Sequence, residues 1–272
     1  MSRLTVRKIE NISFKDHEKD CFHDLYMNYF HLVFYVFVPK GEKYFIDTIA
    51  QVIRYLDPEF KAEARDFILQ ESNHMILHDK FNKAFFKHYP LLSKIIKFQN
   101  TVMPIATYLP LKINLATVVA TEHFTALWSR WVLQNRIGDK AVNDDFGRFL
   151  KWHSLEEIEH ISFVEECLEA LECSYFHRLL GVFAAIFSVI LPGLLMVFFM
   201  TTKDKRLYSK SGLNSFRQFL FAKNGISRSI LIPFFLYIFP FLDHKIEISR
   251  ILFQEIDESL KSHYTIIASV KS

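Results

Sequence analysis

Two Glu-x-x-His motifs are the residues of this sequence best suited to chemistry. They are Glu71 with His74 and Glu157 with His160. In a helix, residues three apart lie on the same face, so each pair can bind one metal ion through a carboxylate oxygen and an imidazole nitrogen. One such motif is frequent by chance, whereas two in the same chain favour a shared metal centre.

Two further glutamates extend this ligand set. Glu42 and Glu122 both lie on the apolar stripe of a predicted helix, where an unpaired carboxylate costs free energy unless a positive charge compensates it. A pair of divalent cations would provide that charge. One Glu from each of two helices, with Glu-x-x-His from two others, is the ligand set of ferritin-like di-iron and di-manganese proteins.

Two histidines fall on the same helix faces. His78 lies four residues after His74, and His153 lies four residues before Glu157. They either bind metal directly or donate hydrogen bonds to the ligand carboxylates. The predicted metal ligands are therefore Glu42, Glu71, His74, His78, Glu122, His153, Glu157 and His160.

Two neighbours of these ligands remain as supporting candidates. His123 points about 100° away from Glu122, and we expect it to support the ligands from behind or to pack as a polar core residue. Glu156 directly precedes Glu157 and is the alternative candidate for the same role. The Glu-x-x-His register favours Glu157 as the ligand and leaves Glu156 as a bridging carboxylate or as the catalytic base.

Four helices must position these residues, and the breakers around Pro58, Pro90, Pro110 and Gly138 delimit them. Glu42 and Glu71 are 29 residues apart and Glu122 and Glu157 are 35 apart, as antiparallel hairpins require, and the 51 residues from Glu71 to Glu122 allow a long crossover. We predict an all-α, ferritin-like four-helix bundle with extra N-terminal and hydrophobic C-terminal helices. The expected helices cover residues 42–56, 59–89, 91–107 (the connector), 111–134, 145–173 and 245–262.

The composition of the chain changes near residue 175. We expect residues 1–175 to form the metal-binding bundle and residues 176–272 to form a hydrophobic helical extension. Residues 179–200 are 22 residues without a charge, enough to span about 30 Å of hydrocarbon, whereas residues 229–242 are shorter and contain two prolines. The extension can pack on the bundle, lie on a membrane surface or span a membrane, and these alternatives stay open.

The overall composition excludes several classes of protein. With 7 Gly and 8 Pro in 272 residues, the chain contains no glycine-rich phosphate-binding loop. A net charge of +3 argues against nucleic acid as a partner. Three cysteines without a Cys-x-x-Cys motif fit a reducing compartment, and residues 1–21 lack the apolar core of a signal peptide. We expect a cytoplasmic protein, with association with the inner membrane through residues 179–242 as an open alternative.

Four segments resemble a bacterial family described as predicted metal-dependent hydrolases, which is placed with ferritin-like folds. They are residues 38–45, 67–82, 120–126 and 152–160. The most specific of them reads Gln-Glu-x-x-His-x-x-x-His-x-x-Phe-Asn from Gln70 to Asn82. The resemblance implies metal binding through the same Glu and His positions.

The chemistry of the predicted ligands favours oxygen activation, because mixed carboxylate and imidazole ligands in a dry helical bundle suit iron or manganese. We therefore expect an oxygen-dependent di-iron oxidoreductase acting on a hydrophobic small molecule. The alternative is a binuclear metal-dependent hydrolase with Glu156 as base, and a third hypothesis is iron storage. The expected cofactors are two divalent metal ions, iron first, with manganese or zinc as alternatives. A membrane surface and a second copy of the chain, forming a homodimer, are further partners to consider.

Overall fold

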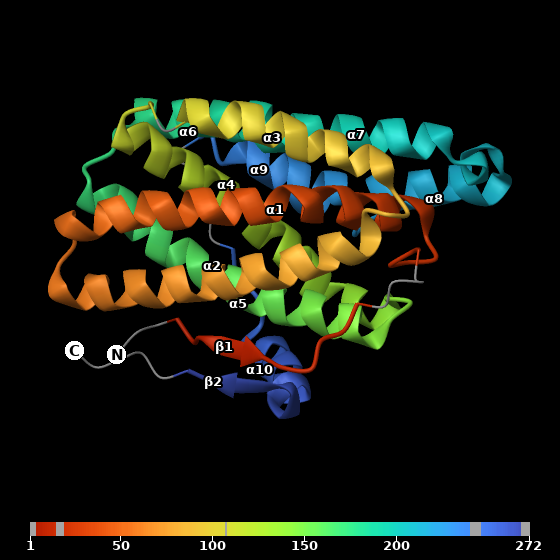
Figure 1. The fold of residues 1–272 in the computed structure, drawn as a ribbon, viewed down its shortest axis with the longest axis horizontal. Coiled ribbons are helices and arrows are strands. Elements are labelled where there is room, and N and C mark those ends of the chain that lie inside the picture. Colours follow the sequence, from red (N-terminus) through yellow and green to blue (C-terminus); the bar gives the residue numbers. More distant parts are fainter. Residues whose placement is uncertain (1–3, 15–18, 107, 240–245, 268–272) are drawn as a thin grey trace.

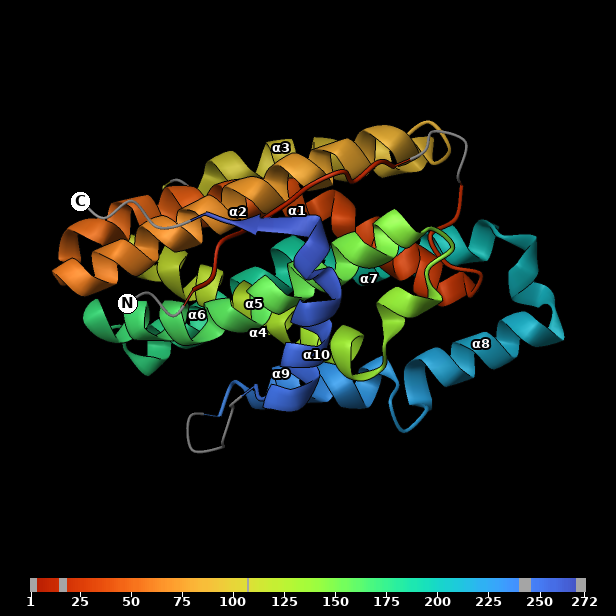
Figure 2. The same cartoon turned by 90° about the horizontal axis from the view of Figure 1, so that it is seen from below.

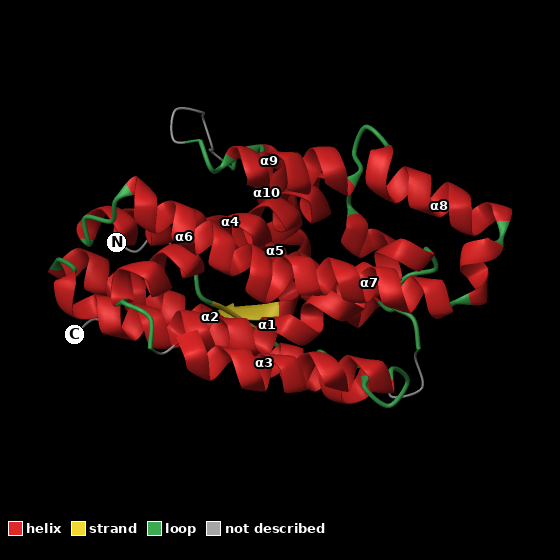
Figure 3. Cartoon of the chain, turned by 90° about the horizontal axis from the view of Figure 1, so that it is seen from above, coloured by secondary structure: helices red, strands yellow, loops and turns green. Residues whose placement is uncertain are grey.

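The computed structural model describes residues 4–14, 19–106, 108–239 and 246–267. These residues are mostly helical, as Figure 3 shows, which confirms the expected all-α bundle. Its central helices are α1 (Leu25–Val52), α2 (Pro58–Phe85), α4 (Leu111–Gln134) and α5 (Asp144–Ala170).

The central helices form two hairpin-like pairs. Helix α1 packs along α2, and α4 packs along α5. A short 3₁₀ turn over Ile53–Tyr55 joins α1 to α2, so the two helices run in opposite directions, as the colours of Figure 1 show. A second 3₁₀ turn, Ile137–Lys140, joins α4 to α5. The pairs bring together the faces that carry the predicted ligands.

Helix α3 (Ser93–Ala106) connects the two pairs. It follows the 3₁₀ turn Pro90–Leu92 and packs against α1 before the chain enters α4 (Figure 1). The sequence predicts this connector at residues 91–107, of which residue 107 lies outside the described residues. Helix α3 therefore provides the expected crossover.

Helix α1 begins well before the expected position, residue 42. Pro39 lies inside it and does not break it, although proline removes one backbone hydrogen bond from a helix. The carbonyl that loses its donor is that of Tyr35, and the side-chain amide of Asn82 on α2 donates to it at 3.2 Å. A neighbouring helix thus replaces the missing bond, which sequence periodicity does not reveal.

The described residues before α1 form strand β1 (Arg7–Ile9) in place of the expected N-terminal helix. This strand pairs in antiparallel fashion with β2 (Tyr264–Ile266), with Lys8 opposite Thr265. Figure 2 shows the ribbon beside α10 (Arg250–Leu260), which packs on α5. The predicted final helix, residues 245–262, is thus shorter than expected, and its first residue lies outside the described residues.

The apolar segment of the C-terminal part forms one long helix. Helices α6 (Tyr175–Ala185) and α7 (Leu191–Lys203) are joined by a π-helical segment, Ile186–Ile190, and α6 packs along α4. The Pro-Gly pair at residues 192 and 193 does not end the helix. A Cβ at Gly193 would lie 2.7 Å from the ring of Phe34, so glycine allows α7 to approach α1 closely.

This helix, Tyr175–Lys203, is long and apolar enough to cross a membrane, judged by length and composition alone. Only 28% of its most apolar window is buried in the protein. The chain continues through α8 (Lys210–Phe221) and a second π-helical segment, Ser227–Leu231, into α9 (Ile232–Leu236). Residues 240–242 of the second predicted apolar run lie outside the described residues. The division of the chain at residue 175 stays a prediction.

Candidate metal centre

The eight predicted ligands converge in the middle of the bundle. Helix α1 provides one glutamate, α2 provides one glutamate and two histidines, α4 provides one glutamate, and α5 provides one glutamate and two histidines. Each of the eight residues is at most 5% exposed. They are Glu42, Glu71, His74, His78, Glu122, His153, Glu157 and His160.

One group of ligands, which we call site B, lies between α2, α4 and α5. It consists of Glu71, Glu122, Glu157 and His160, whose ligand atoms all lie within 4.8 Å of one another. His160 Nδ1 lies 3.1 Å from a carboxylate oxygen of Glu71 and 3.4 Å from one of Glu122. Two ligands of one ion, each at ~2.1 Å, lie about 3–4 Å apart, so these separations suit a shared ion.

A second group, site A, lies beside site B and consists of Glu42, His78 and His153. Glu42 Oε1 lies 3.7 Å from His78 Nε2 and 3.6 Å from His153 Nε2. The structure thus brings both additional histidines into the cluster at a distance that fits direct ligation. Whether they bind a metal stays a prediction.

Glu157 and His74 connect the two sites. Glu157 Oε1 lies 3.3 Å from His153 in site A and 3.8 Å from His160 in site B. His74 Nδ1 lies 3.5 Å from the same oxygen, and it also forms a group with Glu42 and Glu71. The ligand atoms of the two sites are therefore contiguous, and Glu157 Oε1 lies within 4 Å of a histidine from each site.

Burial and mutual repulsion dominate the electrostatics of the carboxylates. Burial and the nearby carboxylate of Glu157 raise the pKa of Glu122 to about 8, although His160 opposes this. Burial and the carboxylate of Glu71 raise the pKa of Glu42 well above its usual range. Burial would also raise the pKa of Glu157, but His153, His74 and His160 hold it well below its usual range.

The pKa values of the histidines also depend on burial and on neighbouring charges. Burial lowers the pKa of His153 to about 3, with a contribution from His74. Burial alone would lower the pKa of His74, but its contacts with Glu156 and Glu157 raise it to about 9. Without metal, the cluster therefore holds several protons that bound cations would displace.

Glu156 orients His74 from the side opposite Glu157. Its Oε2 lies 2.8 Å from His74 Nε2, and because an ionised carboxylate only accepts hydrogen bonds, Nε2 is the donor. Once a bound cation displaces the proton of Nδ1, the lone pair of that nitrogen points toward the other ligands. Glu156 Oε1 accepts a 2.8 Å hydrogen bond from the backbone N–H of Arg7. Both oxygens of Glu156 are thus engaged, which disfavours the expected role as catalytic base.

Arg7 contacts the acidic residues behind the cluster, and the sequence did not reveal this. Its guanidinium is buried and pairs with Glu159 on α5 and Asp257 on α10, each at 2.9 Å. Arg7 thereby fixes β1 against the helix that carries Glu156. An isolated arginine near the N-terminus gives no signal in the sequence, because its partners lie more than 140 residues away.

His123 lies outside the four groups of potential metal ligands found among the described residues. Its ring stacks on Tyr237 with a centroid distance of 4.1 Å, and Tyr237 in turn lies under the guanidinium of Arg178. Of the two expected roles, these contacts favour packing beneath the C-terminal segment over support of the ligands.

The ligand atoms themselves indicate that cations fit here. Among the described residues, both carboxylate oxygens of Glu42, Glu71 and Glu122 are buried without a hydrogen-bond partner, as are His74 Nδ1 and His153 Nε2. Buried polar atoms are normally satisfied, so such a concentration calls for ligands. Four carboxylates, counting Glu157, match the charge of two divalent cations, and mixed oxygen and nitrogen donors suit transition metals.

Comparison with known proteins assigns the family. The family model described as predicted metal-dependent hydrolase matches residues 5–242. The chain belongs to this family. The match extends from β1 through α9 and ends before α10, so it comprises the ligand helices together with most of the apolar extension. No curated protein and no solved structure matches the chain.

The family assignment corrects one expectation and supports another. The expectation of an oxygen-dependent oxidoreductase was wrong, because the family is named for metal-dependent hydrolysis. Mixed carboxylate and imidazole ligands are also used by hydrolytic metal centres, so the ligand types alone did not separate the two reactions. Metal dependence is supported by the family and by the buried Glu and His clusters.

Proposed function

We propose that this chain is a hydrolase whose catalytic centre is the eight-residue cluster, holding one divalent cation at site A and one at site B. The observation that carries the proposal is the set of buried carboxylate oxygens without hydrogen-bond partners, facing imidazole nitrogens at 3.1–3.9 Å. Membership of the metal-dependent hydrolase family supports the same reaction class.

Most residues of the cluster would bind the cations, whereas Glu156 positions one of the ligands. Glu71, Glu122 and His160 would hold one cation and Glu42, His78 and His153 the other. Glu157 would contact both, and His74 would bind through Nδ1 between the two sites. When bound, two cations supply Lewis acidity, lowering the pKa of a coordinated water and polarising the bond under attack. Through its hydrogen bond to His74, Glu156 acts as a positioning residue rather than as the base.

The open side of the centre is a small cavity. It has a volume of about 40 Å³ and is lined by Glu42, His153 and Glu157 together with apolar side chains of α1 and α4. A water molecule needs roughly 10–15 Å³ of such volume, so the cavity has room for the attacking water beside the scissile group. The apolar walls exclude bulk water, which strengthens the electrostatic effect of the centre.

Metal analysis with matched variants tests this proposal. The full chain is stripped with a chelator, reloaded separately with zinc, manganese or ferrous iron, and assayed on esters, amides and phosphate esters. We expect two ions per chain, and hydrolysis that disappears on stripping and returns on reloading. Glu71→Ala and Glu157→Ala should each lose tight metal binding, since each removes a central ligand.

Two controls separate ligand loss from unfolding. Glu71→Gln keeps the shape of the side chain, so helical content measured by circular dichroism should stay constant while metal binding falls. Glu258→Gln removes an exposed carboxylate that pairs with Lys261 and should leave metal content unchanged. Full occupancy in both Glu71→Ala and Glu157→Ala would refute the ligand assignment.

A further inference from the structure

Two cavities meet beside the metal centre. The larger, which we call the outer pocket, has a volume of about 300 Å³ and lies between α1, α3, α4 and the α6–α7 helix. The smaller is the 40 Å³ cavity at the metal ligands, which we call the inner cavity. Both are lined by the same four residues, which we call the neck: Gly41, Phe45, Thr121 and Val189.

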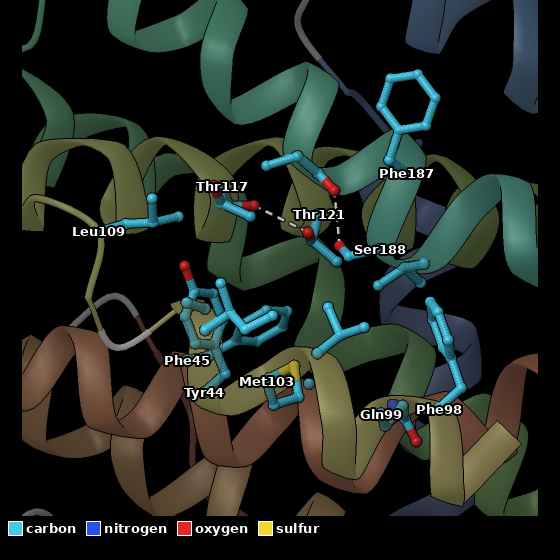
Figure 4. A pocket seen from close by; sticks show the side chains of 16 residues that line it. Tyr44, Phe45, Phe98, Gln99, Met103, Leu109, Thr117, Thr121, Phe187 and Ser188 are labelled. Carbon is cyan, nitrogen blue, oxygen red and sulfur yellow. Dashed lines mark hydrogen bonds between the residues drawn. The ribbon is translucent and has the colours of Figure 1, made fainter.

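The outer pocket therefore adjoins the cavity at the ligands. The neck residues line both cavities, and the inner cavity is also lined by Glu42, His153 and Glu157. Figure 4 shows Phe45 of α1, Met103 of α3 and Thr121 of α4 around the outer pocket. A linear molecule placed in both cavities would present one end to the metal centre.

The wall of the outer pocket is mostly apolar, and most of its polar groups are engaged within the protein, although Gln99 Oε1 is buried without a hydrogen-bond partner. The hydroxyls of Thr117, Thr121 and Ser188 each donate to a carbonyl of their own helix. Tyr44 donates its hydroxyl to Asn114 Oδ1 at 2.9 Å. Among the described residues that line either cavity, no lysine or arginine is present to bind an anionic group.

The mouth of the outer pocket is also apolar. Ile105 on α3 and Phe187 on the α6–α7 helix line the pocket and are 61% and 62% exposed. Phe187 belongs to the helix that is long and apolar enough to cross a membrane. The mouth thus lies on a surface that attracts hydrophobic molecules rather than charged ones.

We propose that the outer pocket and neck bind the hydrocarbon chain of a neutral acyl substrate, a long-chain ester or amide, and deliver its carbonyl to the metal centre. The inference rests on the proposed hydrolase function. A phosphate ester is disfavoured because the cavities offer no cationic side chain, and a short polar substrate would leave the apolar pocket unfilled. A pocket of 300 Å³ lies within the usual range for organic ligands.

The reaction is a simple hydrolysis that needs no oxidant or reductant. The oxygen of water forms a bond to the acyl carbon, and the bond from that carbon to the leaving oxygen or nitrogen breaks. One proton of the water passes to the leaving group. The products are a carboxylic acid, with its chain in the outer pocket, and an alcohol or amine.

A chain-length series tests the proposal on the full, metal-loaded protein in mild detergent. We expect kcat/KM to rise from acetyl to long-chain esters of the same alcohol. Gly41→Leu should lower the ratio of long-chain to short-chain kcat/KM by roughly tenfold or more, because added methyl groups at the neck obstruct the chain. A Cβ at Gly41 lies 4.0 Å from Phe45 Cζ, so the backbone accommodates the substitution.

Further variants keep this test decisive if Gly41→Leu folds poorly. Ala184→Phe narrows the outer pocket at a different place and should shift the preference in the same direction. Leu195→Trp adds bulk to an exposed position of the same long helix that lines neither cavity, and should leave the chain-length profile unchanged. A flat profile in the wild-type protein, or equal profiles in all three variants, would overturn the proposal.

A binding measurement separates the pocket from the reaction. A long-chain alcohol brominated beside its hydroxyl carbon has no ester or amide bond to cleave, and its bromine should quench Trp128, which lines the inner cavity. We expect saturable quenching that Gly41→Leu weakens and Trp128→Phe abolishes. Quenching without hydrolysis of any ester or amide would refute the proposed function alone, whereas hydrolysis without saturable quenching would refute the pocket assignment.

Discussion

At the scale of single residues, the predicted ligand His74 is oriented by the neighbouring carboxylate of Glu156. Glu156 accepts hydrogen bonds from both His74 and the Arg7 backbone. Glu156→Gln offers one acceptor oxygen for these two donors, so one donor would face the amide nitrogen. We expect metal affinity to fall by roughly tenfold to a hundredfold, measured by competition with a chromogenic chelator. Unchanged affinity would contradict the positioning role, and Glu258→Gln serves as the control.

The protons held by the metal-free cluster predict how metal binding depends on pH. The pKa of Glu122 is raised to about 8 and that of His74 to about 9, so both groups are largely protonated at neutral pH. A cation must displace these protons, and apparent affinity should therefore rise with pH until about pH 9 and then level off. Calorimetry in buffers of different ionisation enthalpy should detect net proton release at pH 7. Absence of release would contradict the prediction.

At the scale of elements, α1 continues through Pro39 because Asn82 of α2 donates a hydrogen bond to the carbonyl that the proline leaves without a donor. Asn82→Leu would leave the Tyr35 carbonyl buried without a donor, and should lower the free energy of unfolding by about 1–3 kcal/mol. Pro39→Ala restores a backbone N–H at the position that can bond to this carbonyl. The loss from Asn82→Leu should therefore be smaller in the Pro39→Ala background, and denaturant unfolding of the four proteins measures this coupling. Equal losses of unfolding free energy in the two backgrounds would contradict this role of Asn82.

The same elements show where sequence reasoning succeeds. Residues 111–134 were predicted as a helix and form α4, because an apolar periodicity and a flanking proline define it locally. The two Glu-x-x-His motifs also placed their side chains on one face. The start of α1 was not predictable in this way, since a proline normally ends a helix and only Asn82, 43 residues further along the chain, changes that outcome.

At the scale of the whole molecule, the exposed apolar helix predicts that the protein binds to lipid bilayers. Leu195 and Phe198 are exposed on the helix Tyr175–Lys203. We expect the full chain to cosediment with phosphatidylcholine vesicles. The double variant Leu195→Lys with Phe198→Lys should bind at least tenfold more weakly, because a charge in the hydrocarbon costs roughly 2.5–3.5 kcal/mol. Ser211→Lys in α8 is the control, and equal binding of all three proteins would refute the prediction.

The site could be predicted from the sequence only where its residues share a helix or a repeated spacing. All eight expected ligands meet in the structure, because each lies on the inward face of its own helix. Arg7 and the pairing of β1 with β2 could not be foreseen, since they depend on contacts between segments about 250 residues apart. The cavities also escaped prediction, because side chains from helices far apart in the sequence line them together.

The small ribbon of β1 and β2 has a consequence for biosynthesis. When a ribosome has completed α5, all the cluster's glutamates and histidines have been made, yet Asp257 and β2 are still missing. Arg7 then lacks one of its three carboxylate partners, and β1 lacks its only paired strand among the described residues. We therefore expect Glu156 to be less firmly held, and a chain that stalls before the C-terminal strand to bind metal more weakly than the finished protein.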